Sequence, residues 1–186
     1  MARIPYPSAA TLDAESAAAV ERFPVTINIV RMIPHATSLA GPLLELAERV
    51  MSTLELSPRH REMLVLVAAH ELDCEYEWVQ HVPQARSAGL DDTDLERLSA
   101  TNPSAWPDPV DETVFRAGRA CVRGNGCDAE TMADLTDKLG VRRALEALYV
   151  AGFIRMFAAV INSIDLEIDP SGDVLATAWR TRAEAR

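Results

Sequence analysis

Apolar residues recur along this chain every three or four positions, the spacing that places side chains on one face of a helix. In the clearest stretch the apolar positions are Leu39, Leu43, Leu46, Ala47, Val50 and Leu54. The same pattern, with start and stop signals, places further helices at residues 9–23, 58 onward, 73–88, 91–98, 109–122, 128–139 and 141–165. The sequence therefore predicts an all-α helical bundle of about seven helices.

One stretch is ambiguous by propensity. Val25–Met32 is rich in β-branched residues, but no partner strand with an alternating pattern follows it, so we expect a loop or a short helix. The helix starts are marked more clearly. Ser57 before Pro58 combines a capping hydroxyl with a proline in the first helical position. Asp73 is expected to cap the next helix, and Gly89 to end it.

A chain of 186 residues is long enough for one good core, and a second domain would be unusually small. We therefore expect a single domain over 1–186, with a core at about 25–168 and an N-terminal arm over 1–24. The polar tail 169–186 is expected to be mobile or to reach a neighbouring subunit.

The charge balance excludes some partners. Asp and Glu outnumber Lys and Arg by 28 to 18, which gives a net charge of -10, so nucleic acid and anionic membrane are not expected to bind. The apolar run 144–164 is interrupted by Glu146, Arg155 and Asn162, which favours a buried core helix over a membrane span. Residues 1–11 lack an apolar signal core, and three cysteines are too few for a disulfide framework, so a cytoplasmic location is expected.

Candidate chemistry is concentrated between residues 71 and 81. If a helix starts at Asp73, then Cys74, Glu77 and His81 share one narrow face, at positions i, i+3 and i+7. A thiol in the first helical turn is favoured as thiolate, and a histidine can move a proton near neutral pH. The alternative is that these residues, with Tyr76 and Trp78, are ordinary core side chains.

The string Cys74-Glu-Tyr-Glu-Trp-Val-Gln-His81, followed by Ala85-Arg-Ser-Ala-Gly-Leu90, resembles the signature of the carboxymuconolactone decarboxylase family. An Arg61-Glu62 pair precedes it, as in that family. A looser similarity runs from about Asn28 to the final helix with Asn162. The resemblance implies the alkylhydroperoxidase D-like (AhpD-like) helical fold, assembly into homotrimers or hexamers, and no metal or organic cofactor.

In the alkylhydroperoxidase branch of the family, a glutamate and a histidine relay protons to a CxxC pair of thiols. Glu62, Cys74 and His81 match that relay, but Glu77 stands where the second cysteine belongs. Because a carboxylate cannot form or resolve a disulfide, the resemblance favours the decarboxylase-like branch. There His81 is expected to donate or accept the proton, while Glu62 and Glu77 orient it or have their ionisation pushed apart.

Other residues are weaker candidates. Tyr76, Trp78 and His35 are assigned to substrate binding. Arg155 interrupts an apolar run, and a buried guanidinium would need either a substrate carboxylate or an acidic side chain as partner. A metal held by Glu62, Glu77 and His81 is a further alternative, with too few imidazoles for high affinity.

The leading hypothesis is a cofactor-independent acid/base enzyme, a lyase of decarboxylase type, acting on a small carboxylated or lactone-type organic molecule. One alternative is a thiol-dependent, peroxiredoxin-like peroxidase that uses Cys74, alone or with Cys121 or Cys127 as a distant resolving thiol. The other is a non-catalytic oligomeric scaffold.

Overall fold

The computed structural model describes residues 2–23, 26–101 and 103–170, and within these ranges the chain is helical without a strand. Two short 3-10 helices, η1 (Ala9–Thr11) and η2 (Ile33–His35), accompany eight α-helices. These are α1 (Ala14–Arg22), α2 (Asn28–Met32), α3 (Thr37–Ser52), α4 (Pro58–Glu71), α5 (Glu75–Ser87), α6 (Asp92–Leu98), α7 (Pro109–Arg123) and α8 (Ala129–Ile164). The all-α prediction is confirmed, and the ambiguous stretch before residue 32 contains a short helix.

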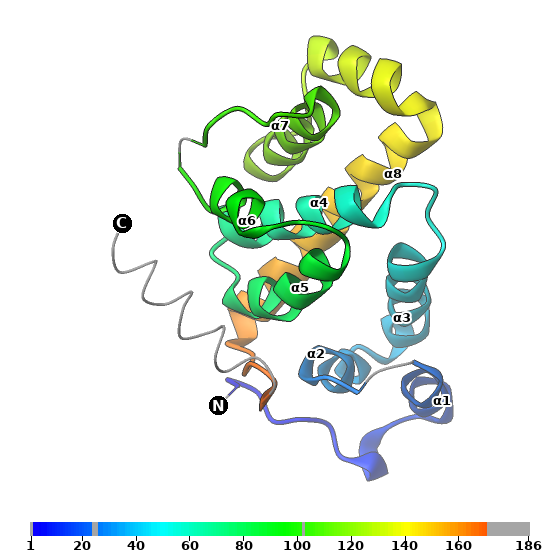
Figure 1. Ribbon diagram of the computed structural model, residues 1–186. Helices are drawn as coiled ribbons and strands as arrows, with labels where there is room; N and C mark the ends of the chain where they lie inside the picture. The colour runs from blue at the N-terminus through cyan, green and yellow to red at the C-terminus, as the bar shows by residue number, and fades with distance from the viewer. Residues whose placement is uncertain (1, 24–25, 102, 171–186) are drawn as a thin grey trace.

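Helix α4 lies at the centre of the bundle. Its residues from Glu62 to His70 are all buried, and it packs against α5, α7 and α8 (Figure 1). Gly118 of α7 permits this close packing, because a Cβ atom there would lie 2.7 Å from Cδ2 of Leu64. A central helix that is buried all round carries its polar residues into the core as well, so Glu62 needs partners there.

Helix α5 begins later than the sequence predicts. Asp73 was expected to cap it, but the structure places Asp73 in the left-handed region at φ 49° and makes Cys74 the N-cap residue. Asp73 and Cys74 instead close the end of α4, because their backbone N–H groups donate to the carbonyl oxygens of His70 and Ala69. Gly89, at φ 91°, follows the end of α5 as predicted.

Helix α8 contains both of the last two predicted helices, with a break at Gly140, where φ is 78°. Its exposed side carries several large apolar residues, and by length and composition the helix could cross a membrane, a property that buried helices of soluble proteins share. Oligomeric assembly and a cytoplasmic location stay predictions. The exposed apolar residues of α8 are Val141, Leu145, Tyr149, Met156 and Val160.

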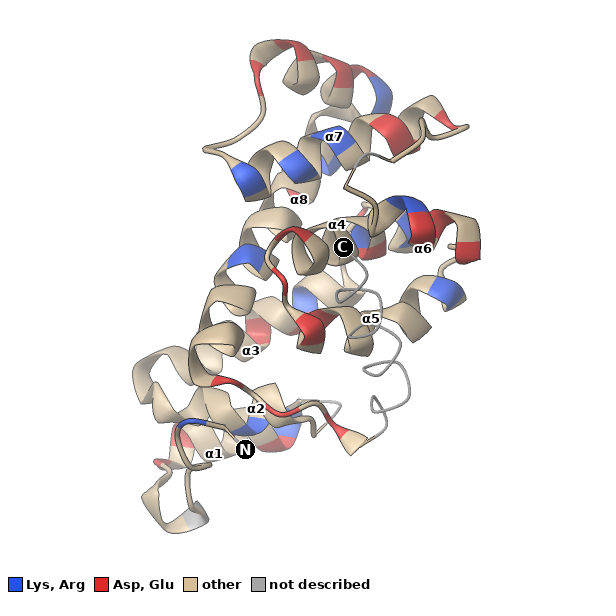
Figure 2. Ribbon diagram, turned by 90° about the vertical axis from the view of Figure 1, so that its left-hand side faces the viewer, with Lys and Arg blue, Asp and Glu red and all other residues tan. Residues whose placement is uncertain are grey.

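Charged side chains of both signs are spread over most of the helices (Figure 2). Some of them tie helices together. Arg59 of α4 donates to Asp94 of α6 at 2.9 Å and to Asp111 of α7 at 2.7 Å. Because both carboxylates are buried, the partly exposed guanidinium satisfies acceptors that would otherwise lack a partner. This network fixes α6 and α7 on α4, away from the candidate chemistry.

The first residue of the predicted tail packs against the helices. Asp169, the first residue of the expected tail, is buried and accepts hydrogen bonds from the Asn28 backbone N–H and the Tyr76 hydroxyl. These bonds hold it against α2 and α5, where a polar pattern alone suggested an exposed residue. The rest of the predicted tail, from residue 171, lies outside the described residues, and the single-domain prediction stays untested.

Candidate active site

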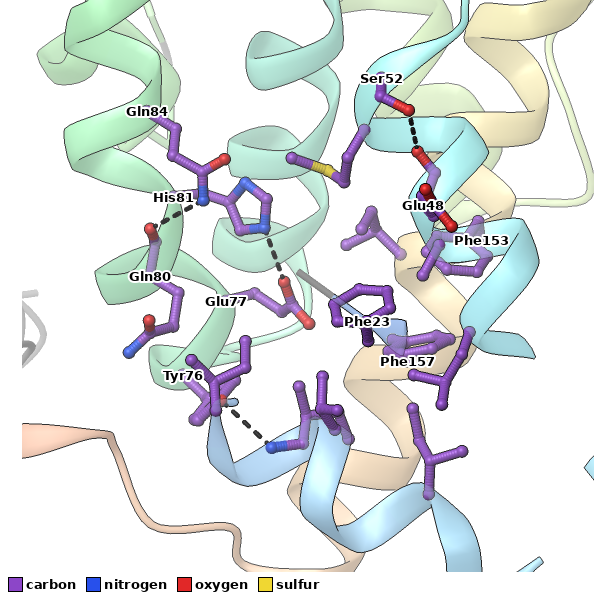
Figure 3. Close-up of a pocket in the computed structure, with 18 residues that line it drawn as sticks. Phe23, Glu48, Ser52, Tyr76, Glu77, Gln80, His81, Gln84, Phe153 and Phe157 are labelled. Carbon is purple, nitrogen blue, oxygen red and sulfur yellow. Dashed lines mark hydrogen bonds and ion pairs between the residues drawn. The ribbon is translucent and has the colours of Figure 1, made fainter. Parts of the chain in front are cut away.

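A cavity of about 460 Å³ lies beside the chemistry-bearing face of α5 (Figure 3). Its walls come from α2, α3, α5 and α8, with Phe23 from the segment after α1. The volume is within the usual range for small-molecule sites. The polar lining residues are Glu48, Ser52, Tyr76, Glu77, Gln80, His81 and Gln84; the apolar ones are Phe23, Ile27, Ile29, Val30, Ile33, Leu44, Ala47, Met51, Phe153, Ile154 and Phe157.

Glu77 and His81 form a polar end of this cavity, which we call its polar pole. They are one helical turn apart on α5, so both side chains point to the same side, and Nε2 of His81 lies 3.4 Å from Oε2 of Glu77 (Figure 3). The other ring nitrogen, Nδ1, lies 2.8 Å from Oε2 of Glu62 on α4. The structure therefore brings Glu62, Glu77 and His81 together, with the imidazole between two carboxyl groups.

Glu62 is held from both sides. Its side chain is 0% exposed, and while Oε2 faces His81, Oε1 accepts a hydrogen bond of 2.9 Å from Nε of Arg61. Arg61 is fixed in turn by a bond of 2.7 Å from its Nη1 to the backbone carbonyl of Met51. An ion pair with two partners makes the buried negative charge tolerable and sets the orientation of the imidazole.

The pKa values of the Glu62 and Glu77 carboxyl groups are shifted in opposite directions. Burial alone would raise the pKa of Glu62, but the hydrogen bonds and charges of His81 and Arg61 outweigh it and lower that pKa. Burial raises the pKa of Glu77, and the nearby Glu62 charge adds to this. For His81, burial acts to lower the pKa, but the hydrogen bond and charge of Glu62, with the charge of Glu77, raise it above 6.5.

A Glu77→Gln variant tests whether the pKa of Glu77 is raised in the folded protein. Because its pKa is raised in the folded state, the folded protein holds this proton more tightly than the unfolded chain does, and stability falls as the pH rises above the ordinary value of 4.5. The variant escapes this loss, by up to about 1.4 kcal/mol per pH unit. We expect its melting temperature, relative to wild type, to increase from about pH 4 to about pH 8. A difference that is constant or decreases over this range would contradict the assignment.

Tyr76 lines the cavity, but its hydroxyl is already engaged. The hydroxyl donates to Oδ2 of Asp169 at 2.7 Å and accepts from the backbone N–H of Ile29 at 3.3 Å. Burial, assisted by the Asp169 carboxylate, raises its pKa, so the phenol stays protonated. Its side chain thus offers the cavity mainly its ring.

Cys74 does not lie with the acid/base residues. It is fully buried as the N-cap of α5, within an apolar cluster that includes Val30 of α2 and Ile161 of α8, and it is not part of the cavity lining. Burial raises its thiol pKa to about 12. The expected stabilisation of a thiolate by the helix terminus is therefore wrong, because desolvation outweighs the backbone hydrogen bonds.

Alkylation provides a direct test of this assignment. With a pKa of about 12, roughly one Cys74 in 10⁴ is a thiolate near pH 8, and the side chain has no exposed surface. We expect iodoacetamide to modify the partly exposed Cys127 first in the native protein, and Cys74 only after unfolding in urea. Peptide mass spectrometry measures both. Native Cys74 reacting as fast as Cys127 would show that the thiol is accessible and activated.

Three of the predicted substrate-binding residues lie away from the cavity. Trp78 points to the other side of α5, into the core formed with α4 and α6. Arg155 is exposed on α8 and donates to the backbone carbonyls of Cys121 and Gly124, so the buried guanidinium predicted from its apolar neighbours is wrong. His35 is exposed, with Nε2 at 2.7 Å from the carbonyl oxygen of Pro5.

Sequence reasoning missed most of the apolar walls. Phe153 and Phe157 of α8 stack at 4.4 Å between ring centroids and face the cavity with Phe23. The four-residue spacing of two phenylalanines was a signal that they share a face, but not of what they face. Arg61 was noticed only as part of a motif. Among the described residues, no group of three or more His, Cys, Asp and Glu is arranged to hold a metal ion.

The family comparison matches the segment that contains this site. Residues 39–107 match the model of the carboxymuconolactone decarboxylase family. The match runs from α3 through α6, and so includes Glu62, Cys74, Glu77 and His81. A search of curated proteins finds no match.

Several solved structures share the fold over nearly the whole chain. A peroxidase-related protein from Silicibacter sp. TM1040 has a TM-score of 0.76 at 17% identity, covering 92% of this chain and 93% of its own. An alkylhydroperoxidase AhpD core protein from Ralstonia eutropha JMP134 has a TM-score of 0.76 at 14% identity, covering 91% and 93%. The debrominase Bmp8, as a cysteine-to-alanine variant in complex with 2,3,4-tribromopyrrole, has a TM-score of 0.70 at 9% identity, covering 94% and 95%. These likenesses confirm the AhpD-like fold.

Proposed function

We propose, for a chain that belongs to the carboxymuconolactone decarboxylase family, that it is a cofactor-independent acid/base enzyme acting on a small carbonyl-bearing molecule of lactone type. The observation that carries this proposal is the buried row Glu62–His81–Glu77, whose His81 and Glu77 open into a cavity of about 460 Å³. A buried glutamate with two partners that fixes a histidine at a cavity wall is an arrangement suited to acid/base chemistry.

The pair at the cavity wall supplies an acid and a base side by side. Glu77 and His81 lie 3.4 Å apart, and the pKa of each is raised above its ordinary value, so their titrations are coupled and one proton can be shared between them. When the proton is on Glu77, the imidazole is the base and the carboxylic acid is a hydrogen-bond donor. A carboxylic acid kept neutral in an apolar site is a known means of stabilising a developing enolate.

The proposed reaction is a proton shift next to the carbonyl. His81 removes a proton from the carbon beside the carbonyl, while Glu77 donates to the carbonyl oxygen, so the C–H electron pair becomes the carbon–carbon double bond of an enol. His81 then returns its proton to carbon at the end of the conjugated system, and Glu77 recovers its own from oxygen. Nothing is oxidised or reduced, and Glu62 stabilises the imidazolium that forms between the two steps.

Decarboxylation is a second candidate, favoured by the family match. In that reaction the departing CO₂ leaves its electron pair on the substrate as an enolate, and His81 supplies the proton that the carbon then needs. The same three residues serve both reactions. They differ in the substrate, because a decarboxylase must admit a carboxylate beside Glu77.

A peroxidase cycle is less well supported, although two of the similar structures are peroxidase-related proteins. Cys74 lies outside the cavity lining and has a pKa raised to about 12, and Glu77 stands where a neighbouring thiol would be needed. A thiol that is neither ionised nor accessible reacts slowly with peroxide.

The proposal is tested with a panel of neutral lactones and cyclic ketones that have a double bond one carbon away from conjugation, such as α-angelica lactone. Nuclear magnetic resonance in D₂O detects both isomerisation and deuterium incorporation at carbon, and release of CO₂ from carboxylated lactones tests the second candidate. We expect wild type and Cys74→Ser to be active and His81→Gln to be inactive. If Cys74→Ser abolishes turnover and His81→Gln does not, the thiol route replaces the proposal. If no panel member turns over or exchanges, the acid/base proposal fails.

A further inference from the structure

We infer that the cavity selects an uncharged, largely apolar ring compound with one hydrogen-bonding oxygen, and that it discriminates against carboxylates. This inference deepens the proposed function and rests on it for the assignment of Glu77 and His81 as the groups that meet the substrate. It concerns binding, which can be measured without turnover.

The walls are suited to a flat apolar molecule. Three phenylalanines, Phe23, Phe153 and Phe157, surround the space opposite α5, and aliphatic side chains of α2 and α3 complete the walls (Figure 3). Aromatic side chains attract a further ring through offset or edge contacts. Burial of the ligand's hydrocarbon surface here provides most of the binding free energy, at about 25 cal/mol per Å² of apolar area removed from water.

The charges of the lining disfavour an anion. No Lys or Arg is among the described lining residues, and the only cationic candidate, His81, is already paired with Glu62 at 2.8 Å. Glu77 and Glu48 both line the space. A carboxylate bound there would lose its hydration without gaining an unpaired cation, and desolvation of an unpaired charge costs several kcal/mol.

The lining of an adjoining hollow is acidic as well. A neighbouring hollow of about 520 Å³ shares Phe23, Leu44 and Glu48 with the cavity. Its lining adds Glu15 and Glu45, against one basic residue, Arg22. Glu45 is paired with Arg49 at 2.9 Å, which leaves Glu15 and Glu48 as the acidic side chains of this lining that disfavour an anion, and the net charge of -10 acts in the same direction at long range.

The polar pole sets the orientation of a neutral ligand. Tyr76 is engaged with Asp169, so the polar groups that α5 offers to a ligand oxygen are Glu77 and His81, together with the Gln80 amide, whose buried Nε2 has no hydrogen-bond partner among the described residues. A carbonyl oxygen accepts from protonated Glu77, and the ring then lies toward Phe153 and Phe157. A single oxygen held at one end of an apolar cavity is the recognition pattern that a lactone or a cyclic or aryl ketone satisfies.

Acetophenone and benzoate are a matched pair of probes, because they share a ring and a similar size but differ in charge. We expect wild-type protein near pH 7 to bind acetophenone at least about tenfold more tightly than benzoate by calorimetry. Acetophenone should also shift the imidazole resonance of His81, which locates it in this cavity. Benzoate binding as tightly as acetophenone, or acetophenone leaving the His81 signal unchanged, would overturn the inference.

A charge variant sharpens the test. Met51→Lys places an ammonium group in the lining, and Val160→Lys places the same group on the exposed side of α8 as its control. We expect benzoate to gain affinity only in Met51→Lys. An equal gain in both variants would show that net charge, not the cavity, governs anion binding.

The outcomes separate this inference from the proposed function. Selective binding of acetophenone by wild type and by His81→Gln, with no proton exchange in any substrate, would sink the proposed reaction and leave the ligand class standing. Turnover of carboxylated lactones together with tight benzoate binding would overturn the ligand class and leave the acid/base function standing.

Discussion

A His81→Gln substitution is expected to slow proton transfer to and from carbon by about 10²–10⁴-fold, the usual contribution of a positioned acid/base group. His81 lines the cavity and has one ring nitrogen toward Glu62 and the other toward Glu77. Glutamine keeps a polar side chain of similar reach but cannot carry the proton. The measurement is the initial rate of deuterium incorporation into the substrate identified in the lactone and ketone panel.

Gln84→Ala is the matched control for this experiment. Gln84 lies on the same helix and also lines the cavity, but it is not part of the carboxyl–imidazole row. We expect its rate to remain within a few fold of wild type. Equal losses in both variants would indicate that disturbance of α5 accounts for the effect, and a fully active His81→Gln would exclude the acid/base role.

A Glu62→Gln substitution is expected to destabilise the fold by about 3–5 kcal/mol near neutral pH, the usual cost of removing one partner from a buried ion pair. The variant removes the carboxylate that lies 2.8 Å from Nδ1 of His81 and 2.9 Å from Nε of Arg61, so two buried cationic or hydrogen-bonding groups lose their partner. Urea unfolding of both proteins measures the difference. The exposed Glu48→Gln at the cavity rim is the control, and it should change stability by less than about 0.5 kcal/mol.

The pH dependence of that difference has a definite sign. The pKa of Glu62 is lowered in the folded state, so its contribution is present above the ordinary value of 4.5 and is lost as the pH falls through the lowered folded value. The pKa of His81 is raised, so its contribution is present below 6.5 and is lost as the pH rises through the raised folded value. The Glu62→Gln defect should therefore be largest between these limits. A defect that grows below about pH 4 would contradict the pairing.

The local part of the site could be predicted from the sequence because it depends on helix geometry alone. Glu77 and His81 are four residues apart on one helix, so they share a face whatever surrounds it. The position of Glu62 next to these two residues could not be predicted from helix geometry. It depends on how α4 packs on α5, and only the family resemblance, with its Arg61–Glu62 pair, pointed to it.

The errors have a common physical cause. Apolar neighbours in sequence suggested a buried Arg155, but the outer side of α8 is itself apolar, with Met156 and Val160 exposed, so apolar neighbours do not imply burial there. For Cys74, the sequence showed a favourable helix terminus but not the apolar cluster that encloses the thiol. Burial is a property of the packed fold, and it decided both cases.

The cavity itself could not be predicted from the sequence. Its walls come from segments far apart in the chain, such as Ile29, Leu44 and Phe157, and no periodicity relates their positions. Periodicity identifies the face that each helix buries but not a space left between those faces. The ligand class therefore depends on lining charges that only the packed fold brings together.

The Glu62–His81 pairing is tested by a pH titration of the His81 imidazole by nuclear magnetic resonance, in wild type and in Glu62→Gln. We expect a wild-type His81 pKa above 6.5 that falls when the Glu62 carboxylate is removed, while His60, whose pKa is lowered chiefly by burial, titrates below 6.5 in both proteins. A wild-type His81 pKa at or below 6.5, or one unchanged in the variant, would contradict the pairing of the Glu62 carboxylate with the His81 imidazole at the cavity wall.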